Sequence, residues 1–362
     1  MKKLISKILY VSVICLAAAG NGLAGEVEIR GTYGGVNSFW EKGHSLADFG
    51  VNAIFVGSYS IDSTLVARAK QEGAKVFTEF AVLNGERYVE EHPEAWPVDR
   101  SGRRSSKADW FMGVCPTDPA FRAWRMQALR ELLRKYPLDG VWMDYVHWHA
   151  QFESSQPILP ETCFCHNCLL AFRAATGVSA PPGGSTADKA NWILEHAESS
   201  WRNWRCSVIA GWARDMKQVI QEERPGALLG LYHAPWTDED FEGARRKILG
   251  LDFHLLSEVV DVFSPMVYHG RMGRPAGWVK EYVEWFCQEL DIREGAFPKV
   301  WPIVQAADDP GSVSPAEFES VLRGGVTVPA SGVMMFTVHA IARDPEKLAV
   351  MKKVYKEWEG RK

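Results

Sequence analysis

The feature that most constrains the fold is the regular alternation of short apolar runs with helical segments along the chain. The apolar runs lack the one-in-two polar alternation of a half-exposed strand, which is typical of parallel strands buried on both faces. We predict strands at residues 28–35, 51–58, 74–82, 140–146, 227–233, 260–269, 300–305 and 332–339. Helical patterns separate or follow them at residues 63–72, 119–135, 188–223, 238–249, 277–290, 315–324 and 345–358.

Eight strands alternating with helices predict an α/β fold, a (β/α)8 TIM barrel, because alternation implies parallel pairing and eight units close the sheet. Asp118 before Pro119 is a good helix N-cap, and Gly73 is a plausible helix stop. A doubly wound open sheet is the alternative architecture. The glycines after the first strand are spaced wrongly for a phosphate-binding fingerprint: Gly31, Gly34 and Gly35.

Two connections are too long for a bare barrel, namely residues 83–118 and 148–189. Long structured loops in compact domains are usually functional. They follow the third and fourth strands, so in a barrel they would wall the pocket on the catalytic face. We therefore expect one barrel domain over residues 26–362.

The first 25 residues have the charge order of a secretory signal peptide. Three lysines precede a short apolar run, and small residues end the segment. We expect export to the periplasm or the outside. Cys15 follows Ile14 where a lipoprotein signal needs a small residue, so free release is favoured over lipid anchoring. No later stretch is long and apolar enough to predict a transmembrane segment.

The composition argues against a nucleic-acid partner. The formal net charge is −4, whereas a nucleic-acid-binding protein would show a basic stripe. The fifteen Trp residues suit a protein that stacks aromatic rings on sugars. A carbohydrate is the expected partner.

The stretch DGVWMDYVHWH, residues 139–149, is the centre of the predicted site. It places one carboxylate, Asp144, near the carboxyl end of an otherwise apolar strand. Glycoside hydrolysis normally uses two carboxyl groups that flank the bond. Asp144 is the first candidate, and its alternative is a structural Asp that holds a loop.

Two residues compete to be the second carboxyl. Glu79 stands near the end of the apolar third strand, where burial would raise its pKa and favour a protonated acid. Asp308, with Asp309, follows the seventh strand and would lie across the barrel. We favour Glu79 over Asp308.

Polar aromatic side chains gather at or just beyond the predicted strand ends. Aromatic faces stack on sugar CH groups, while hydroxyl and imidazole groups bind sugar hydroxyls. The candidate substrate-binding residues are Tyr33, Tyr59, Tyr145, His147, His149, Tyr232, His233, Trp236, Tyr268, His269, Gln305 and His339. A catalytic zinc on His147, His149 and His233 is the competing interpretation, which would make the protein a metallohydrolase or deacetylase.

A cysteine cluster is the most specific motif in the chain. Cys163, Cys165 and Cys168 have a C-x-C-x-x-C spacing that suits three thiolates on one ion, and zinc prefers four ligands. Cys115, in the preceding long loop, is the natural fourth, with His166 as a competing ligand. Oxidation of these exported thiols to disulfides is the alternative to structural zinc. The remaining two, Cys206 and Cys287, fall on predicted helices as buried small residues.

Several ordered segments resemble known families across about half of the chain. HPEAWPVDRSG, VCPTDPAFR, YPLDGVWMDYVHW, CFCHNCLLAFRAATG and DVFSPMVYHGR look like the hypothetical glycosyl hydrolase families, of the family 10 type, built on a barrel related to the α-amylases. The cysteine arrangement resembles that of the family 42 β-galactosidases, in which one Cys before strand four and a C-x-C-x-x-C after it hold structural zinc. This resemblance implies zinc ligation by Cys115, Cys163, Cys165 and Cys168.

The resemblance to family 42 supports the zinc site better than it supports β-galactosidase activity. Family 42 enzymes have an Asn-Glu pair at the end of strand four, where this chain has Met143 and Asp144. Chitinase-like enzymes share the DG opening of that strand, but Val146 stands where they need Glu. We predict an exported glycosidase acting on a poly- or oligosaccharide. A non-catalytic glycan-binding barrel is the alternative.

Overall fold

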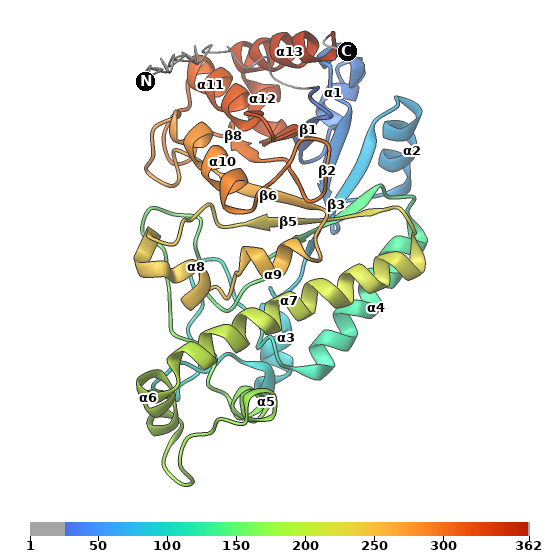
Figure 1. The fold of residues 1–362 in the computed structure, drawn as a ribbon. Coiled ribbons are helices and arrows are strands. Elements are labelled where there is room, and N and C mark those ends of the chain that lie inside the picture. The colour runs from blue at the N-terminus through green and yellow to red at the C-terminus, as the bar shows by residue number, and fades with distance from the viewer. Residues whose placement is uncertain (1–25, 361–362) are drawn as a thin grey trace, which may run out of the picture.

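The structure is a computed structural model that describes residues 26–360, so the predicted signal peptide and Cys15 lie outside the described residues. The chain forms a closed barrel of parallel strands surrounded by helices (Figure 1). Closure occurs where β5 pairs with β6, which excludes the open doubly wound sheet. The strands are β1 (Ile29–Tyr33), β2 (Ala53–Gly57), β3 (Lys75–Ala81), β4 (Gly140–Asp144), β5 (Leu228–His233), β6 (Val262–Val267), β7 (Lys299–Val300), β8 (Ile303–Gln305) and β9 (Gly332–Phe336).

All eight predicted strands are present, and only the seventh leaves its expected range, by one residue at Lys299. The seventh is divided into β7 and β8, because Trp301 and Pro302 interrupt the pairing with β6. Proline has no backbone N–H to donate, so a break at Pro302 leaves no donor unpaired.

Aromatic rings fill the barrel interior below the carboxyl ends of the strands. The ring of Phe77 lies 4.8 Å from that of Phe55 and 4.6 Å from that of Trp142, and Trp301 stacks on Trp142 at 5.7 Å between centroids. Neighbouring strands make room with glycine. A Cβ on Gly230 would meet the Trp142 ring at 2.1 Å. The interior is therefore a packed core, and any binding space must lie above it, towards the carboxyl ends of the strands.

The principal helices around the barrel match their predicted ranges. Asp118 caps the helix that begins at Pro119 by accepting a hydrogen bond from Phe121 N at 2.7 Å. Gly73 follows the helix that ends at Gln71 and has a φ of 79°. Both features confirm the sequence assignment. These helices are α2 (Ser63–Gln71), α4 (Pro119–Lys135), α10 (Trp278–Glu289), α11 (Pro315–Gly325) and α13 (Pro345–Glu359).

Two helix predictions were wrong in detail. The segment predicted as one helix over 188–223 forms α6 (Thr186–His196) and α7 (Glu198–Glu223), which Ala197 separates with a non-helical φ of −141°. The segment predicted as a helix over 238–249 is a 3-10 turn followed by the short α8 (Ala244–Lys247). There the Asp240 carboxylate binds Thr237 N and Oγ1, and such local bonds compete with a regular helix.

Short helices also occur where none was predicted. They lie in the connections between strands, where brief periodic segments give a weak signal. They are α1 (Asn37–Trp40), α3 (Glu86–Glu91), α5 (His166–Thr176), α9 (Phe253–Ser257) and α12 (Val338–Arg343). The second long connection is thus partly helical.

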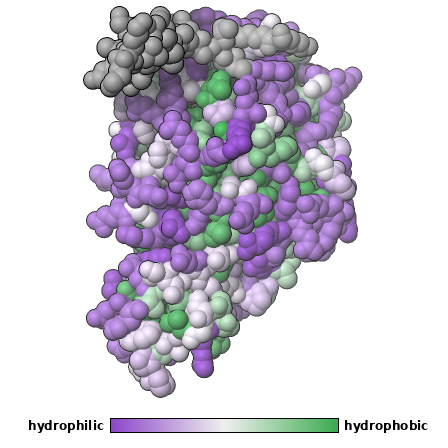
Figure 2. Space-filling view, in the orientation of Figure 1, coloured by the Kyte–Doolittle hydropathy of each residue, from purple (hydrophilic) through white to green (hydrophobic). Residues whose placement is uncertain are grey.

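The helices α5 and α6 form a lobe at the bottom of Figure 1, beside one end of α7. Figure 2 shows this lobe as a protrusion whose visible surface is less hydrophilic than the body above it. Across the body, α4 and α7 are joined by ion pairs, including Arg130–Glu222 at 2.9 Å. Over residues 26–360, no helix is long and apolar enough to cross a membrane.

Candidate functional site

A cavity of about 950 Å³ opens at the carboxyl ends of the strands. It lies above the aromatic core, on the face where barrel enzymes bind their ligands. The loops after β1, β2, β3, β4, β6 and β9 contribute to its wall, and its floor comes from the strand ends. Its polar lining includes three acidic and three basic side chains: Glu41, Asp144, Glu153, Lys42, Arg271 and Arg343.

Asp144 is the last residue of β4 and lines this cavity. Its Oδ1 accepts a hydrogen bond from Tyr145 N at 2.9 Å. Burial raises the pKa of the Asp144 carboxyl well above its ordinary value, and the charges of Glu79 and Glu153 raise it further. A carboxyl in this setting retains its proton to unusually high pH, as a general acid requires.

Glu79 lies lower in the barrel than Asp144. In the parallel ladder of β3 and β4, Ala81 is level with Asp144, and Glu79 is level with Trp142. Tyr33 donates a hydrogen bond to Glu79 Oε2. Burial raises the pKa of Glu79, and the bond from Tyr33 opposes that rise. Tyr33 lines the cavity, whereas Glu79 does not.

Glu153 is an acidic residue that sequence reasoning missed. It lies in the connection after β4, lines the cavity, and pairs with Arg271 Nη1 at 3.0 Å. Burial raises the pKa of Glu153 to about 7, although Arg271 lowers it and the Glu79 charge adds to the rise. The only sequence signal was its place in a loop predicted to wall the pocket, since no motif distinguishes it.

Six of the predicted substrate-binding residues do line the cavity. Trp110, which was not predicted, joins them with 42% of its surface exposed and its ring 5.5 Å from that of Tyr145. Tyr59 is 86% exposed at the mouth. The predicted residues in the wall are Tyr33, Tyr59, Tyr145, Tyr232, Tyr268 and His339.

The backbone is strained beside this wall. Tyr145 has a φ of 53° and Asp109, next to Trp110, a φ of 54°. Residues other than glycine rarely adopt positive φ, and such strain concentrates at ligand sites. Tyr145 and Trp110, the neighbour of Asp109, both line the cavity, so these backbone positions orient rings that can stack on a sugar.

Three predicted histidines lie in the packing behind the wall. His149 accepts a hydrogen bond from Gly113 N at 3.0 Å and contacts Ser106 O at 2.9 Å, while His147 Nδ1 contacts Trp148 O at 2.8 Å. The His233 ring packs on Phe253 and Phe286. Burial lowers the pKa of His147 to about 4 and that of His233 to about 3.

These positions do not bring the three histidines together as metal ligands. Within residues 26–360, the four-cysteine cluster is the only group of three or more His, Cys, Asp or Glu side chains placed to hold an ion. The buried histidines stay neutral and support the loops.

The other predicted residues also fall outside the cavity lining. Trp236 and His269 are buried. Gln305 is buried too, and its Oε1 accepts a hydrogen bond from Arg271 N at 3.2 Å. Asp308 pairs with Lys347 at 2.7 Å, and the hydrogen bond from Lys347 is the main cause of its lowered pKa. Asp308 thus anchors α13 to the loop after β8, away from Asp144.

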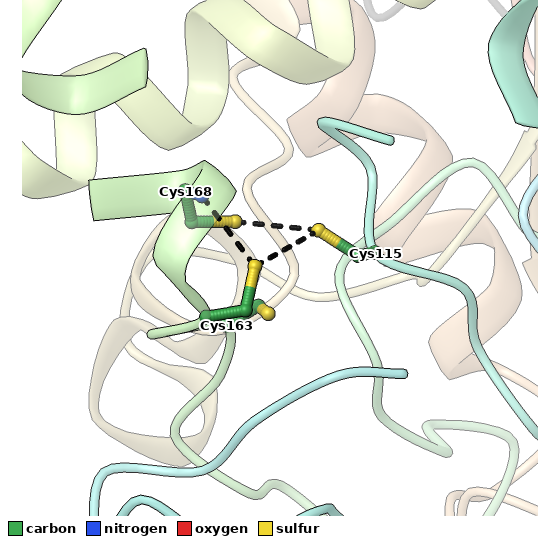
Figure 3. A group of neighbouring side chains, drawn as sticks. Cys115, Cys163 and Cys168 are labelled. Carbon is green, nitrogen blue, oxygen red and sulfur yellow. Dashed lines mark hydrogen bonds between the residues drawn. The ribbon is translucent and has the colours of Figure 1, made fainter. Parts of the chain in front are cut away.

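The four predicted cysteine ligands do converge. All four are buried, and their sulfur atoms lie within 4.8 Å of one another. Figure 3 shows Cys115, on the loop before α4, facing Cys168 at the start of α5 across 3.4 Å between sulfur atoms. Cys165 caps α5, where its sulfur accepts a hydrogen bond from Cys168 N.

The geometry fits a tetrahedral ion. Zinc–sulfur bonds of about 2.3 Å place sulfur atoms about 3.8 Å apart, near the 3.4 and 3.5 Å from Cys115 to Cys168 and Cys165. A disulfide needs about 2.05 Å, and the described cysteines are free. Hydrogen bonds from the other three cysteines, that from Cys115 first, lower the pKa of the Cys165 thiol. Burial raises the pKa of the Cys163 and Cys168 thiols. A bound cation would stabilise the charged thiolates and so offset the cost of burying them.

With this geometry in place, comparison with solved structures is informative. The fold is that of known glycoside hydrolases. The PgaB (BpsB) glycoside hydrolase domain from Bordetella bronchiseptica is similar with a TM-score of 0.68 at 11% identity, covering 89% of this chain and 98% of that one. The β-galactosidase from Marinomonas ef1 is similar with a TM-score of 0.62 at 12% identity, covering 91% and 59%.

A further β-galactosidase, from Halorubrum lacusprofundi, has a TM-score of 0.64 at 14% identity and covers 91% of this chain and 58% of its own. The chain therefore spans somewhat over half the length of these β-galactosidases, and nearly all of the PgaB domain. No protein-family model and no curated protein sequence matches the chain. At these identities the likeness establishes the barrel fold.

Proposed function

We propose that this protein is an exported glycoside hydrolase that cleaves a glycosidic bond in a poly- or oligosaccharide by carboxyl chemistry. The observation that carries this proposal is an aromatic-lined cavity with two buried acids, Asp144 and Glu153, in its wall and a third, Glu79, below them, each near enough for its charge to act on another. Burial raises the pKa of all three carboxyls, and neighbouring acids raise those of Asp144 and Glu153 further. Such an environment favours a protonated carboxyl, which can donate its proton.

Asp144 is the carboxyl that we assign to the reacting bond. It lines the cavity, and burial together with its two acidic neighbours favours its protonated form. A protonated carboxyl can donate its proton to the glycosidic oxygen as the bond to the sugar carbon breaks. The second carboxyl then acts on the opposite side of that carbon, and Glu79 and Glu153 are the two candidates.

The aromatic wall suits a carbohydrate. Tyrosine faces and the exposed Trp110 ring can stack on sugar CH groups, and the tyrosine hydroxyls can bind sugar hydroxyls. The solved structures with this fold include the PgaB glycoside hydrolase domain and several β-galactosidases, which supports the same reaction class here. The sugar-binding set that we propose includes Tyr33, Tyr59, Trp110, Tyr145, Tyr232, Tyr268 and His339.

We also propose that the four cysteines hold a structural zinc ion. Cys115, Cys163, Cys165 and Cys168 would supply all four ligands, which leaves no position for an activated water. The ion would join the loop before α4 to the start of α5 and so brace the connections on either side of β4.

A polysaccharide panel tests the proposed function. We expect the purified protein to release reducing ends from at least one polysaccharide or one aryl glycoside in the panel. Binding without any release would instead support the glycan-binding alternative. Neither binding nor release across the panel would contradict both interpretations.

A further inference from the structure

Only some of the acids at the site can reach a bound sugar. Asp144 and Glu153 line the cavity, whereas Glu79 lies below them and is hydrogen-bonded by Tyr33, which does line it. A group that exchanges a proton with substrate or water must be within hydrogen-bond reach of it. This requirement separates the two candidates for the second carboxyl and favours Glu153.

Arg271 holds Glu153 by one oxygen. Glu153 Oε2 accepts from Arg271 Nη1 at 3.0 Å, and among the described residues no other side chain binds this carboxyl. The Glu153 side chain is only 9% exposed. Its second oxygen, Oε1, is therefore left for a ligand or a water in the cavity.

Arg271 is itself fixed by the loop after β8. Its backbone N–H donates to Gln305 Oε1 at 3.2 Å, and its guanidinium pairs with Asp309 Oδ2 at 3.1 Å. The guanidinium carbon also lies 5.2 Å from the centre of the Phe336 ring. Connections after β4, β6 and β8 therefore combine to set the position of Glu153, as a preorganised catalytic group requires.

We propose that Glu153 is the second catalytic carboxyl and that Arg271 is its positioning residue. This assignment rests on the proposed function. As Asp144 gives its proton to the glycosidic oxygen, the carbon–oxygen bond breaks and its electron pair leaves with that oxygen. Water forms the new bond to the sugar carbon and gives a proton to Glu153. Proton exchange with solvent then restores both carboxyls, so the net reaction consumes one water.

The charges around Glu153 set the sign of its pH dependence. Arg271 lowers the pKa of Glu153, and Glu79 raises it. In turn, Glu153 raises the pKa of Asp144, Tyr145 and Tyr268. Glu153 must be ionised to accept a proton, so activity falls as the pH drops through its pKa. Removing Arg271 raises that pKa and should move the acidic limb of the kcat profile to higher pH.

The first experiment compares kcat of three variants on the aryl glycoside that the wild-type protein cleaves fastest. We expect Glu153→Gln to lower kcat by about a thousandfold or more with a small change in KM, and Glu79→Gln to lower it far less. Glu222→Gln, at an acid on α7 that pairs with Arg130 outside the cavity, is the matched control and should keep wild-type kcat. A loss below tenfold in Glu153→Gln, or a greater loss in Glu79→Gln, would overturn the assignment.

A second experiment separates catalysis from folding. Adding azide to Glu153→Ala should restore turnover and yield a glycosyl azide, because azide attacks the sugar carbon without needing a base. Arg271→Met should show the acidic limb shifted to higher pH. If azide does not rescue Glu153→Ala and the acidic limb of Arg271→Met does not shift, in variants that melt like the wild type, Glu153 is not the second catalytic carboxyl. If the wild type itself cleaves nothing in the panel, it is the proposed function that fails.

Discussion

At the residue scale, the sequence predicted an acid that lines the cavity, Asp144, but not how deep in the barrel Glu79 lies. Asp144 was predictable because a lone carboxylate interrupts an apolar strand. Glu79 was predicted by the same logic and does lie beside it, but two residues lower on β3, a register that strand prediction cannot set. Glu153 could not be predicted because the residue that holds it in the cavity wall, Arg271, lies 118 positions later in the chain.

The Tyr33 hydroxyl offers a test of how the buried acids influence one another. Its hydrogen bond lowers the pKa of Glu79, so Tyr33→Phe should raise that pKa and keep Glu79 neutral to higher pH. A neutral Glu79 no longer raises the pKa of Asp144. We therefore expect the basic limb of the kcat profile, where Asp144 loses its proton, to move to lower pH.

The matched control for this variant is Tyr136→Phe. Tyr136 is also buried, but its hydroxyl donates to Ile61 O outside the cavity. Its pH profile should match that of the wild type. A basic limb that stays in place in Tyr33→Phe would show that Glu79 does not influence the proton on Asp144.

At the element scale, strands were predicted better than the connections between them. Apolar runs indicate burial directly, so all eight strands were predicted to within one residue outside their ranges. Helix α5 was not predicted because its N-cap, Cys165, and the first-turn residue Cys168 belong to the cysteine cluster, which we interpreted as a metal-binding loop. The break at Ala197 carries no Gly or Pro, so no local signal marked it.

The cysteine cluster gives a prediction about the connections around β4. We expect metal analysis to find about one zinc per chain, and Cys165→Ser to lower the melting temperature without abolishing turnover. The physical reason is that the ion joins residues 115 and 163–168 and restricts the unfolded chain. Mass spectrometry showing two disulfides and no metal would refute zinc.

Cys206→Ser is the control for the metal. Cys206 is also buried, on α7, but is not part of the four-sulfur cluster. It should retain the zinc content of the wild type. Loss of zinc in this variant would mean that zinc content depends on the overall fold and does not identify the four cysteines as ligands.

The anchor of α13 gives a prediction about stability. Lys347 is 1% exposed but Asp308 is 52% exposed, so solvent screens their pair and Asp308→Asn should lower the free energy of unfolding at pH 7 by about 0.5 kcal/mol. The pKa of Asp308 is lowered on folding, so its contribution is present above its unfolded value and is lost as pH falls through its folded value. Denaturant unfolding should therefore show the difference at pH 7 and none near pH 2.

At the scale of the whole molecule, alternation alone predicted the closed barrel, because eight strand and helix units leave few other arrangements. It also predicted which end carries the site. Alternation could not predict which polar side chains at that end reach the cavity. Of the twelve proposed ligand residues, six are buried and do not line the cavity: His147, His149, His233, Trp236, His269 and Gln305. Strand-end position specifies a face, whereas side-chain direction depends on packing between distant loops.

The most direct test of the account measures turnover and binding together for the wild type and Asp144→Asn. Asn keeps the shape of the side chain but has no acidic proton, so we expect kcat to fall by about a thousandfold or more while glycan affinity and melting temperature stay close to those of the wild type. Substrate cleavage and calorimetric binding would be measured on the same preparations. A variant that binds equally and loses only two- or threefold in kcat would contradict the central claim that Asp144 carries the chemistry.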